Sequence, residues 1–301
     1  MRYLDADAVA ALGYAAAVEA VSSALRGGLD PAADPSRVPV PLTHGQFLLM
    51  PSESPGSPGS AGVKVATVAP GNAELGLPRV QAVYLLFDRT TLALRAVLDG
   101  TALTTLRTPA VSVAAVLPRL PDRPLHVAVV GAGPQATGHV AALSAVREAA
   151  SVTYLVRDPA RAPFDAVALA TGPADDALRA ADVIVCATSA RSPVLDSELV
   201  RDDAVVVAVG SHEPDARELD AALLGRSTVV VEDVGTALRE AGDVVLALAE
   251  GALAEADLVT MVDVVTGRTE VPQDRPLVFK SVGMAWEDLV VAEAVERAAR
   301  G

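Results

Sequence analysis

The sequence predicts an α/β protein with a doubly wound parallel sheet and a second, α+β domain. Near residue 123 the pattern changes, and from there short, fully apolar runs alternate with helical segments. Such runs, separated by helices, are typical of parallel strands that are buried on both faces of a sheet. A glycine-rich turn at 131–136 stands where the first of these runs passes into a helix. Together these observations predict a sheet of the Rossmann type.

The chain before residue 123 predicts a mixture of helices and strands. Residues 4–28 are rich in alanine and predict one opening helix, which Asp5 or Asp7 caps and a pair of glycines ends. The proline-spaced segment 28–42 is expected to be extended or looped. A low-complexity run of Pro, Gly and Ser at 51–61 predicts a surface loop. Strand-like runs lie at 46–50, 63–68, 80–87 and 92–98, and a long helix is expected at 99–117.

The alternating part of the chain predicts parallel strands with helices between them. These strands are expected within 125–133, 151–157, 182–189, 204–211 and 227–234. The end of the chain, 281–301, predicts one more amphipathic helix, which is expected to return and pack on the first domain.

The charge balance restricts the possible partners. The chain has 24 basic and 38 acidic residues, which gives a formal net charge of −14. Nucleic acids and anionic membranes require a basic face, so neither is expected as a partner. Aromatic residues make up only 3% of the chain, which argues against a platform that stacks on bases or sugars. A small anionic ligand is compatible with this charge if a few cations gather in one pocket.

The sequence carries no pattern of a targeting signal. No apolar run approaches the roughly 18 residues that a membrane span needs. The first residues, MRYLDADAVAAL, include acids where a signal peptide has its basic region, and we expect a cytoplasmic protein. The single cysteine, Cys186, lies in an apolar run and is expected to be a buried, unreactive thiol. No residues are assigned to a metal site.

Lysine is rare in this chain. Only two of the 24 basic residues are lysines, Lys64 and Lys280, and the others are arginines. A lysine differs from an arginine in its compact charge and in a pKa that the surroundings can shift. Either lysine taken alone could be present by chance, so the motif around it is needed to decide whether it has a function.

The turn at 131–136 reads GAGPQA and matches a dinucleotide-binding fingerprint. Gly131 permits the tight turn, Gly133 lets the backbone approach a pyrophosphate, and Ala136 packs the helix on the strand. Pro134 and Gln135 complete the cofactor loop. The pyrophosphate would lie on the N-terminus of the following helix. A glycine turn that holds no nucleotide is the alternative.

The end of the second strand of this domain bears on the choice of cofactor. Enzymes that use NAD place an acid there, which binds the ribose 2′-hydroxyl. Here Val156 stands at that position and Arg157 follows, and an arginine pairs with a 2′-phosphate. NADP(H) is therefore favoured over NAD(H). Asp158 would serve NAD(H) instead if the strand ended slightly later.

Motifs along nearly the whole chain resemble the ornithine cyclodeaminase/mu-crystallin family. They are RVPVPL at 37–42, VKVATVAPGN at 63–72, DGTALTTLRTPAVS at 99–112, GAGPQATGH at 131–139, ADVIVCATS at 181–189, AVGSHEPDARELD at 208–220, EAGD at 240–243 and FKSVGMAWED at 279–288. So many matches in one order are specific to the family, although not to one reaction. Both lysines lie within these motifs, which lowers the chance that either is incidental.

The resemblance implies a division of the chain. A dinucleotide-binding Rossmann domain would span 120–275, and residues 1–119 with 276–301 would form a substrate-binding domain through which the protein is a homodimer. The resemblance further implies that the carboxylate of a small imino or amino acid is held by Arg37, Lys64 and Arg107. Arginine with lysine makes a sound clamp for one carboxylate. Without the resemblance, three separate cations would mean little, because most arginines of an acidic protein pair with surface carboxylates.

The resemblance also implies which residues line the cofactor. They are Thr108, Gly133, Gln135, Arg157, Thr188, Gly210 and His212. Val282 joins them in the SVG turn, and Lys280 immediately precedes that turn, where its role is either structural or related to the cofactor.

Two positions distinguish the reactions of the family. Cyclodeaminases have an aspartate for the substrate amine where this chain has His212, and a glutamate where it has Leu48. Mu-crystallin-like imine reductases lack both acids, and this chain resembles them at both positions. His212 is expected either to protonate an imine nitrogen or to form a neutral hydrogen bond at the edge of the cofactor. Lys64 is the second candidate catalytic residue.

We therefore expect an NAD(P)H-dependent oxidoreductase that acts on the C–N bond of a small imino or amino acid. It would be a ketimine or cyclic imine reductase, or an amino acid dehydrogenase in the reverse direction. A cyclodeaminase that recycles its bound NAD⁺ is one alternative, and a low-turnover, mu-crystallin-like ligand-binding protein is another. Net oxidation of the cofactor would separate the reductase from the cyclodeaminase, and tight binding without turnover would support the binding protein.

Overall fold

The computed structural model describes residues 1–55 and 59–300. The chain divides into two compact units, of which unit 1 comprises Met1–Val111 with Met284–Gly301 and unit 2 comprises Ser112–Gly283. The segment expected to form the Rossmann domain, 120–275, lies within unit 2. The expected α/β fold with a parallel sheet is confirmed.

Unit 1 is built on a six-stranded sheet with the order β1-β6-β5-β4-β3-β2. Its strands are β1 (Arg2–Leu4), β2 (Val38–Leu42), β3 (Gly45–Glu53), β4 (Ser60–Val68), β5 (Val80–Asp88) and β6 (Leu94–Asp99). β1 runs parallel to β6, and the other neighbours are antiparallel. Alternate residues at the start of β4 are buried, which is the pattern of a sheet with one covered face. Lys64 belongs to this buried row, between Gly62 and Ala66.

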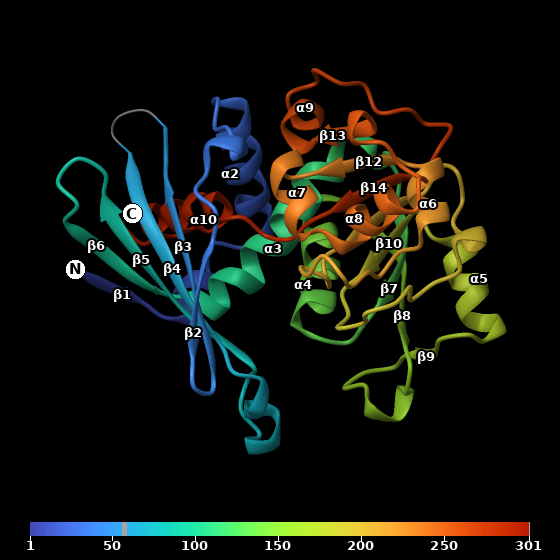
Figure 1. The fold of residues 1–301 in the computed structure, drawn as a ribbon, viewed down its shortest axis with the longest axis horizontal. Coiled ribbons are helices and arrows are strands. Elements are labelled where there is room, and N and C mark those ends of the chain that lie inside the picture. Colours follow the sequence, from blue (N-terminus) through green and yellow to red (C-terminus); the bar gives the residue numbers. More distant parts are fainter. Residues whose placement is uncertain (56–58, 301) are drawn as a thin grey trace. The chain divides into compact units, whose positions relative to one another are not determined.

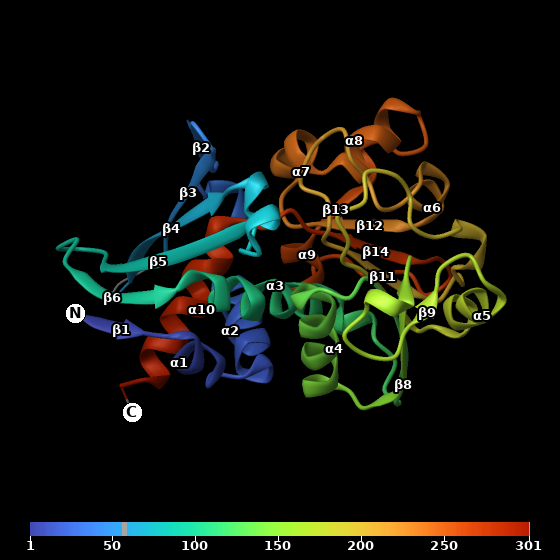
Figure 2. The same cartoon turned by 90° about the horizontal axis from the view of Figure 1, so that it is seen from below.

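Helices cover the buried face of this sheet. They are α1 (Ala6–Ala10), α2 (Tyr14–Arg26), the first part of α3 (Gly100–Val116) and α10 (Ala285–Ala298). The unit also has two 3-10 turns, η1 (Pro31–Ala33) and η2 (Pro70–Leu75), the second of which connects β4 and β5. The C-terminal helix α10 contacts α2 and the strands β3, β4 and β5 (Figures 1 and 2). Its side chains Trp286, Leu289 and Val291 are buried, so residues from the end of the chain complete the core of unit 1.

Two local expectations for unit 1 were wrong. The segment 4–28 is not one helix, because Gly13 adopts a positive φ of 74° and separates α1 from α2. Asp5 still caps the first helix, since its side chain accepts a hydrogen bond from the Ala8 N–H at 2.9 Å. Residues 51–53 continue β3 instead of opening a loop. The centre of that expected loop, 56–58, lies outside the described residues.

Unit 2 is built on an eight-stranded sheet with the order β13-β12-β14-β11-β10-β7-β8-β9, and the strands pair in parallel throughout. The five expected strands are β7 (Leu125–Val130), β8 (Ala149–Val156), β10 (Val183–Cys186), β11 (Val205–Ala208) and β12 (Thr228–Val231). The sequence analysis missed β9 (Val167–Ala168), β13 (Leu258–Thr260) and β14 (Leu277–Lys280). β14 enters the sheet between β11 and β12, which places Lys280 at its carboxyl edge.

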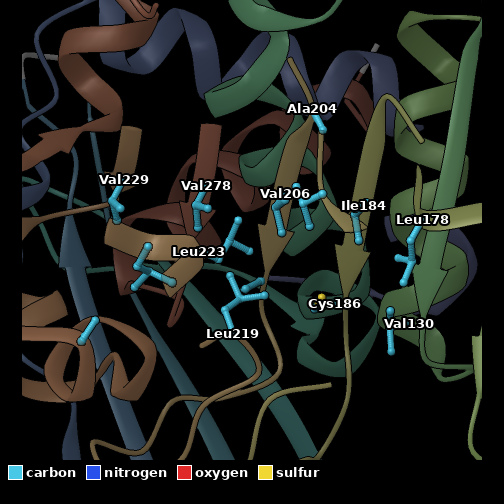
Figure 3. Packing of buried hydrophobic residues seen from close by; sticks show 14 of the residues in the cluster. Val130, Leu178, Ile184, Cys186, Ala204, Val206, Leu219, Leu223, Val229 and Val278 are labelled. Carbon is cyan, nitrogen blue, oxygen red and sulfur yellow. The ribbon is translucent and has the colours of Figure 1, made fainter. Parts of the chain in front are cut away.

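The sheet of unit 2 is buried on both faces. Ile184 and Val206 pack with Leu178 and Leu223 of two helices in one core cluster (Figure 3). The neighbouring Val185 points to the opposite face and is equally buried. The helices of this unit are α4 (Pro134–Val146), α5 (Gly172–Ala180), α6 (Ala221–Arg226), α7 (Val234–Glu240), α8 (Gly242–Ala249) and α9 (Met261–Val265), with the 3-10 turns η3 (Leu117–Arg119), η4 (Pro159–Arg161), η5 (Ser197–Leu199) and η6 (Glu255–Asp257). Cys186 lies in this cluster as a buried free thiol, as expected.

Candidate functional site

The glycine turn of unit 2 is tight at its first glycine. β7 ends at Val130, and Gly131 follows with a φ of 130°. A Cβ atom on Gly131 would lie 2.5 Å from the carbonyl oxygen of Ala187, so this position requires glycine. Ala136, in the first turn of α4, is fully buried, which keeps the helix close to the strands.

The second glycine leaves open space. Gly133 is the N-cap of α4, and a Cβ atom placed there would meet nothing within 4 Å. Pro134 is the first residue of the helix, where its missing N–H costs nothing, and Gln135 follows partly buried. The exposed backbone at Gly133 and the N-terminus of α4 therefore fit a pyrophosphate group.

A cavity of about 1000 Å³ lies at the carboxyl ends of β7, β8 and β10. Among the expected cofactor residues it is lined by Gly131, Gly133, Arg157 and Thr188. β7 lies between β8 and β10 in the sheet, so the cavity is at the point where the strand order reverses. Open α/β sheets bind their ligands at that point, and the size is at the upper end of the range of about 300–1000 Å³ for ligand pockets.

A buried carboxylate joins the loops that follow β10 and β11. Glu218 accepts hydrogen bonds from the Thr188 N–H and hydroxyl, both at 2.7 Å, and from the Gly210 N–H at 2.7 Å. Burial raises the pKa of Glu218, while Lys280 and these hydrogen bonds act in the opposite direction. A Cβ atom on Gly210 would lie 2.1 Å from the Thr188 carbonyl oxygen. The structure thus brings together two expected cofactor residues that the sequence places far apart.

Lys280 belongs to the same buried network. Its Nζ lies 3.1 Å from Asp243 Oδ2 and donates a hydrogen bond to the Ser211 carbonyl oxygen at 2.6 Å. Asp243 Oδ1 in turn accepts the Glu218 N–H at 2.7 Å. These contacts are structural, and they hold the segment next to His212 against β14 and α8.

The SVG turn has its own buried anchor. Glu232 accepts hydrogen bonds from the Ser281 hydroxyl at 2.7 Å, the Val282 N–H at 2.9 Å and the Gly283 N–H at 3.0 Å. Val282 is therefore fixed through its backbone, at the end of β14.

His212 is exposed, in the loop that follows β11. Two acids of this loop, Glu213 and Asp215, pair with Arg191, which follows β10 and lines the cavity; the contact with Asp215 is 2.6 Å. The loop that carries His212 is thus tied to the cavity wall by surface ion pairs. His212 itself does not line the cavity, and neither do Pro134, Gln135, Ala136, Gly210 and Val282.

In unit 1 the structure brings Lys64 and Arg107 to the same two acids. Lys64 Nζ lies 2.7 Å from Asp288 Oδ2, and Arg107 Nε lies 3.2 Å from Asp288 Oδ1. Arg107 also pairs with Glu287, which accepts the Met284 N–H at 2.9 Å. All four charged side chains are buried. Charged side chains from β4, α3 and the first turn of α10 thus form one compact cluster.

Burial changes the acid–base properties of this cluster. Burial and the positive charge of Arg107 together lower the pKa of Lys64 to about 8, against the opposing effect of Asp288. A buried ammonium whose pKa lies close to neutrality can both bind an anion and give up a proton.

Arg37 is partly buried, in the loop before β2. Asp34 in the same loop accepts the Trp286 N–H at 2.8 Å, so the loop is fixed to the start of α10. Burial raises the pKa of Asp34 to about 6, although hydrogen bonds oppose this. The same turn of α10 therefore organises the segments that carry all three expected cations. Thr108, an expected cofactor residue, is buried on α3 in unit 1.

Sequence reasoning identified the cations but missed the buried acids that pair with them or fix the neighbouring loops. The acids are Asp34, Glu218, Glu232, Asp243, Glu287 and Asp288. Most lie within the motifs at 208–220, 240–243 and 279–288. A buried lysine requires a carboxylate partner, and this requirement was the signal that could have found them.

Residues 1–55 and 59–300 contain no group of three or more His, Cys, Asp or Glu side chains placed to hold a metal ion. Across the same residues, no helix combines the length and the apolar character that crossing a membrane requires.

Comparisons with known proteins agree with this geometry. The chain is 33% identical over 276 residues to Delta(1)-pyrroline-2-carboxylate reductase 2 of Burkholderia ambifaria, which covers 88% of this chain and 84% of that protein. It is 34% identical over 268 residues to the ketimine reductase mu-crystallin of Mus musculus, with 87% and 83% covered. The structure of the Thermococcus litoralis Delta(1)-pyrroline-2-carboxylate reductase in complex with NADH and L-proline superposes with a TM-score of 0.87 at 27% identity, over 100% of this chain and 98% of that chain.

A model of one protein family matches nearly the whole chain, residues 7–301. The match extends over both units and over every motif on which the resemblance was based. The chain therefore belongs to the ornithine cyclodeaminase/mu-crystallin family.

Proposed function

We propose that this protein reduces the C=N bond of a small cyclic α-imino acid with NADPH. The chain is an NAD(P)-dependent oxidoreductase that acts on the C–N bond of a small imino or amino acid, as its relatives are. The cyclic substrate follows from the names of those relatives, two of which are reductases of pyrroline-2-carboxylate. The observation that carries the proposal is the buried cluster of Lys64, Arg107 and Asp288.

The cluster supplies a proton and a binding site for the substrate carboxylate. An imine accepts hydride at carbon most readily when its nitrogen is protonated. Lys64, with its pKa lowered to about 8 and Asp288 at 2.7 Å, is the proton donor that we propose. NADPH, when bound, would supply the hydride, and Lys64 would regain its proton from solvent after donating it to the imine nitrogen.

The charges of the cluster show that the substrate carboxylate needs one further cation. Two buried cations, Lys64 and Arg107, face two buried acids, Glu287 and Asp288, so the cluster is balanced by itself. Arg37, partly buried in the loop before β2, is the further cation that we assign to the incoming carboxylate. We propose that Arg37 binds the carboxylate and that Lys64 and Arg107 orient it.

His212 is the second proposed proton donor. Its exposure, and the ion pairs of its loop with Arg191, support a role at the rim of the cofactor site, where solvent can reprotonate it. Loss of His212 should then lower turnover more than substrate affinity. Lys64 is the stronger candidate, because its surroundings shift its pKa towards neutrality.

The preference for NADPH rests on the end of β8. Val156, the last residue of the strand, offers no acid for a ribose hydroxyl, and Arg157 lines the cavity. One oxygen of Asp158 accepts the Ala160 N–H at 3.1 Å, which turns this carboxylate towards its own turn. The Thermococcus litoralis relative is described with NADH, so the preference depends on residues of this chain.

We also propose a homodimer formed through unit 1. β2 is an edge strand that is exposed throughout, and Val38, Val40 and Leu42 share one face of it. Exposed apolar rows of this kind mark protein interfaces. Analytical ultracentrifugation should show a dimer, and V40D should shift it towards the monomer without unfolding.

The function is tested by following the absorbance of reduced nicotinamide. The purified protein should oxidise NADPH with pyrroline-2-carboxylate or piperideine-2-carboxylate and produce the saturated amino acid. K64M should abolish turnover, whereas R89M, in an exposed ion pair of the same unit, should keep it. R157A should narrow the difference between the affinities for NADPH and NADH.

An assay with ornithine distinguishes the proposed imine reductase from a cyclodeaminase of the same family. If the protein formed proline and ammonia from ornithine without net change of the cofactor, it would be a cyclodeaminase and the proposed reductase activity would be wrong. The residues Leu48 and His212, at the positions of the two cyclodeaminase acids, favour the reductase.

A further inference from the structure

Two arginines line the same part of the cavity in unit 2. Arg157 follows β8, and Arg161 ends η4. Within the described part of the chain, neither guanidinium pairs with a carboxylate. This is unusual here, because other arginines of the unit do pair, among them Arg123 and Arg201 with Asp182, Arg191 with Glu213 and Asp215, and Arg226 with Asp202. On a chain with a net charge of −14, two unpaired arginines at one cavity indicate a site for an anion.

The backbone fixes Arg161 close to Arg157. Asp158 Oδ1 accepts the Ala160 N–H at 3.1 Å, and the Asp158 carbonyl oxygen accepts the Arg161 N–H at 3.1 Å. These bonds form a single turn that begins with Pro159, whose φ is restricted. β9 then returns beside the end of β8, where the Leu169 N–H binds the Val156 carbonyl oxygen at 2.8 Å. The loop that carries both arginines is therefore closed at its base.

The position of the pair within the cavity identifies the anion. The pyrophosphate of a dinucleotide belongs at Gly133 and the N-terminus of α4, which follow β7. The ribose that distinguishes NAD from NADP belongs at the end of the next strand, which is β8. A phosphate ester there carries close to two negative charges, and two planar guanidinium groups suit its geometry.

We propose that Arg161 is the second residue of a 2′-phosphate clamp, in which Arg157 and Arg161 together bind the 2′-phosphate of NADPH. The proposal rests on the proposed preference for NADPH and assigns that preference to two residues instead of one. Asp158, which is exposed at the same turn, is the one carboxylate between the two arginines in the chain, and one of its oxygens accepts the Ala160 N–H.

Direct binding tests the clamp without reference to turnover. Dissociation constants for NADPH and NADH are measured by the fluorescence of the reduced nicotinamide, for the wild type, R157A, R161A and R161K. R161A should raise the dissociation constant for NADPH by about tenfold, which is the effect of losing one charge-assisted hydrogen bond. The dissociation constant for NADH should change by less than about twofold. R161K should recover part of the lost affinity for NADPH, because lysine keeps the positive charge but not the planar guanidinium group that can donate two parallel hydrogen bonds.

A smaller probe isolates the phosphate. Adenosine 2′,5′-bisphosphate and 5′-AMP differ only in the 2′-phosphate. R161A should bind adenosine 2′,5′-bisphosphate more weakly than the wild type does, and should bind 5′-AMP with unchanged affinity. R179A is the matched control, because Arg179 is an exposed arginine of unit 2 whose partner is Asp176 and which does not line the cavity. Circular dichroism melting should give the same midpoint for all variants.

The outcomes separate this inference from the one on which it rests. Equal affinities of the wild type for NADPH and NADH would overturn the preference and the clamp together. A wild-type preference for NADPH that R157A narrows and R161A leaves unchanged would overturn the role of Arg161 alone. Equal weakening of NADPH and NADH by R161A would place Arg161 at the pyrophosphate, and would likewise overturn it.

Discussion

Lys64 Nζ lies 2.7 Å from Asp288 Oδ2, and both side chains are buried in unit 1. The lysine comes from the fourth strand of the chain and the aspartate from the last helix. Asp288 favours the charged form of Lys64, whereas burial and Arg107 favour the neutral form, and the resulting pKa is about 8. The acid therefore keeps the lysine protonated near neutral pH, which a proton donor requires.

This pairing predicts the pH dependence of turnover. If Lys64 donates the proton, kcat should be constant at low pH and should fall as the pH rises through about 8. In D288N the lysine loses the charge that raises its pKa, so the alkaline limb should move to lower pH by about one unit. E74Q removes an exposed acid of the same unit and should leave the profile in place. An alkaline limb that stays fixed in D288N would rule out Lys64 as the donor.

Arg37 and Arg107 should respond differently to the same substitution. R37A should raise the KM for the imino acid by the loss of one charge-assisted contact, about 1.5–3 kcal/mol, with little change in melting temperature. R107A leaves Glu287 and Asp288 buried without this partner, which typically costs about 3–5 kcal/mol of folding stability. Thermal melting and steady-state kinetics of both variants test this contrast. Equal melting temperatures would show that the buried cluster does not stabilise unit 1.

The two glycines of the cofactor loop provide a matched pair of substitutions. G131A places a Cβ 2.5 Å from the Ala187 carbonyl oxygen at a φ of 130°, and should destabilise the fold by roughly 1–3 kcal/mol. G133A meets nothing within 4 Å and should melt like the wild type. Its methyl group would, however, occupy the space proposed for the pyrophosphate, so NADPH should bind more weakly. Urea unfolding and fluorescence titration separate the two effects, and normal NADPH affinity in G133A would contradict the proposed position of the pyrophosphate.

Asp34 should make the stability depend on pH. Burial raises its pKa in the folded chain to about 6, whereas its usual value is 3.8. Between these values the unfolded chain releases the proton first, so the free energy of unfolding falls as the pH rises from about 4 to 6 and then stays lower. D34N cannot ionise but keeps an oxygen that can accept the Trp286 N–H. It should therefore be more stable than the wild type above about pH 6, and the difference should vanish near pH 4.

Urea unfolding at several pH values measures this difference. D165N, at an exposed position of unit 2, is the control and should follow the wild type. A variant D34N that is less stable than the wild type at neutral pH would show that the ionised carboxylate stabilises the start of α10.

The patterns that the sequence revealed are those that local chemistry enforces. Apolar runs identified the parallel strands of unit 2, because a strand buried on both faces has no room for polar residues. The glycine turn after β7 was predicted from the pattern GAGPQA behind an apolar strand, and the structure gives the reason for its first glycine, a positive φ and a close approach to Ala187. The strands β9, β13 and β14 escaped prediction because they have only two, three and four residues, too few to show a periodic pattern.

The alternating fold, the glycine turn and the two rare lysines with their motifs could be found from the sequence, because each depends on residues that are neighbours in the chain. The carboxylate that each buried lysine pairs with could be found only from the folded chain: Asp288 for Lys64, and Asp243 for Lys280. It also decided that Arg161 lies at the same cavity as Arg157. A buried charge must have a partner, and this requirement can be inferred from the sequence. The choice of partner depends on which segments pack together, and packing is a property of the whole fold.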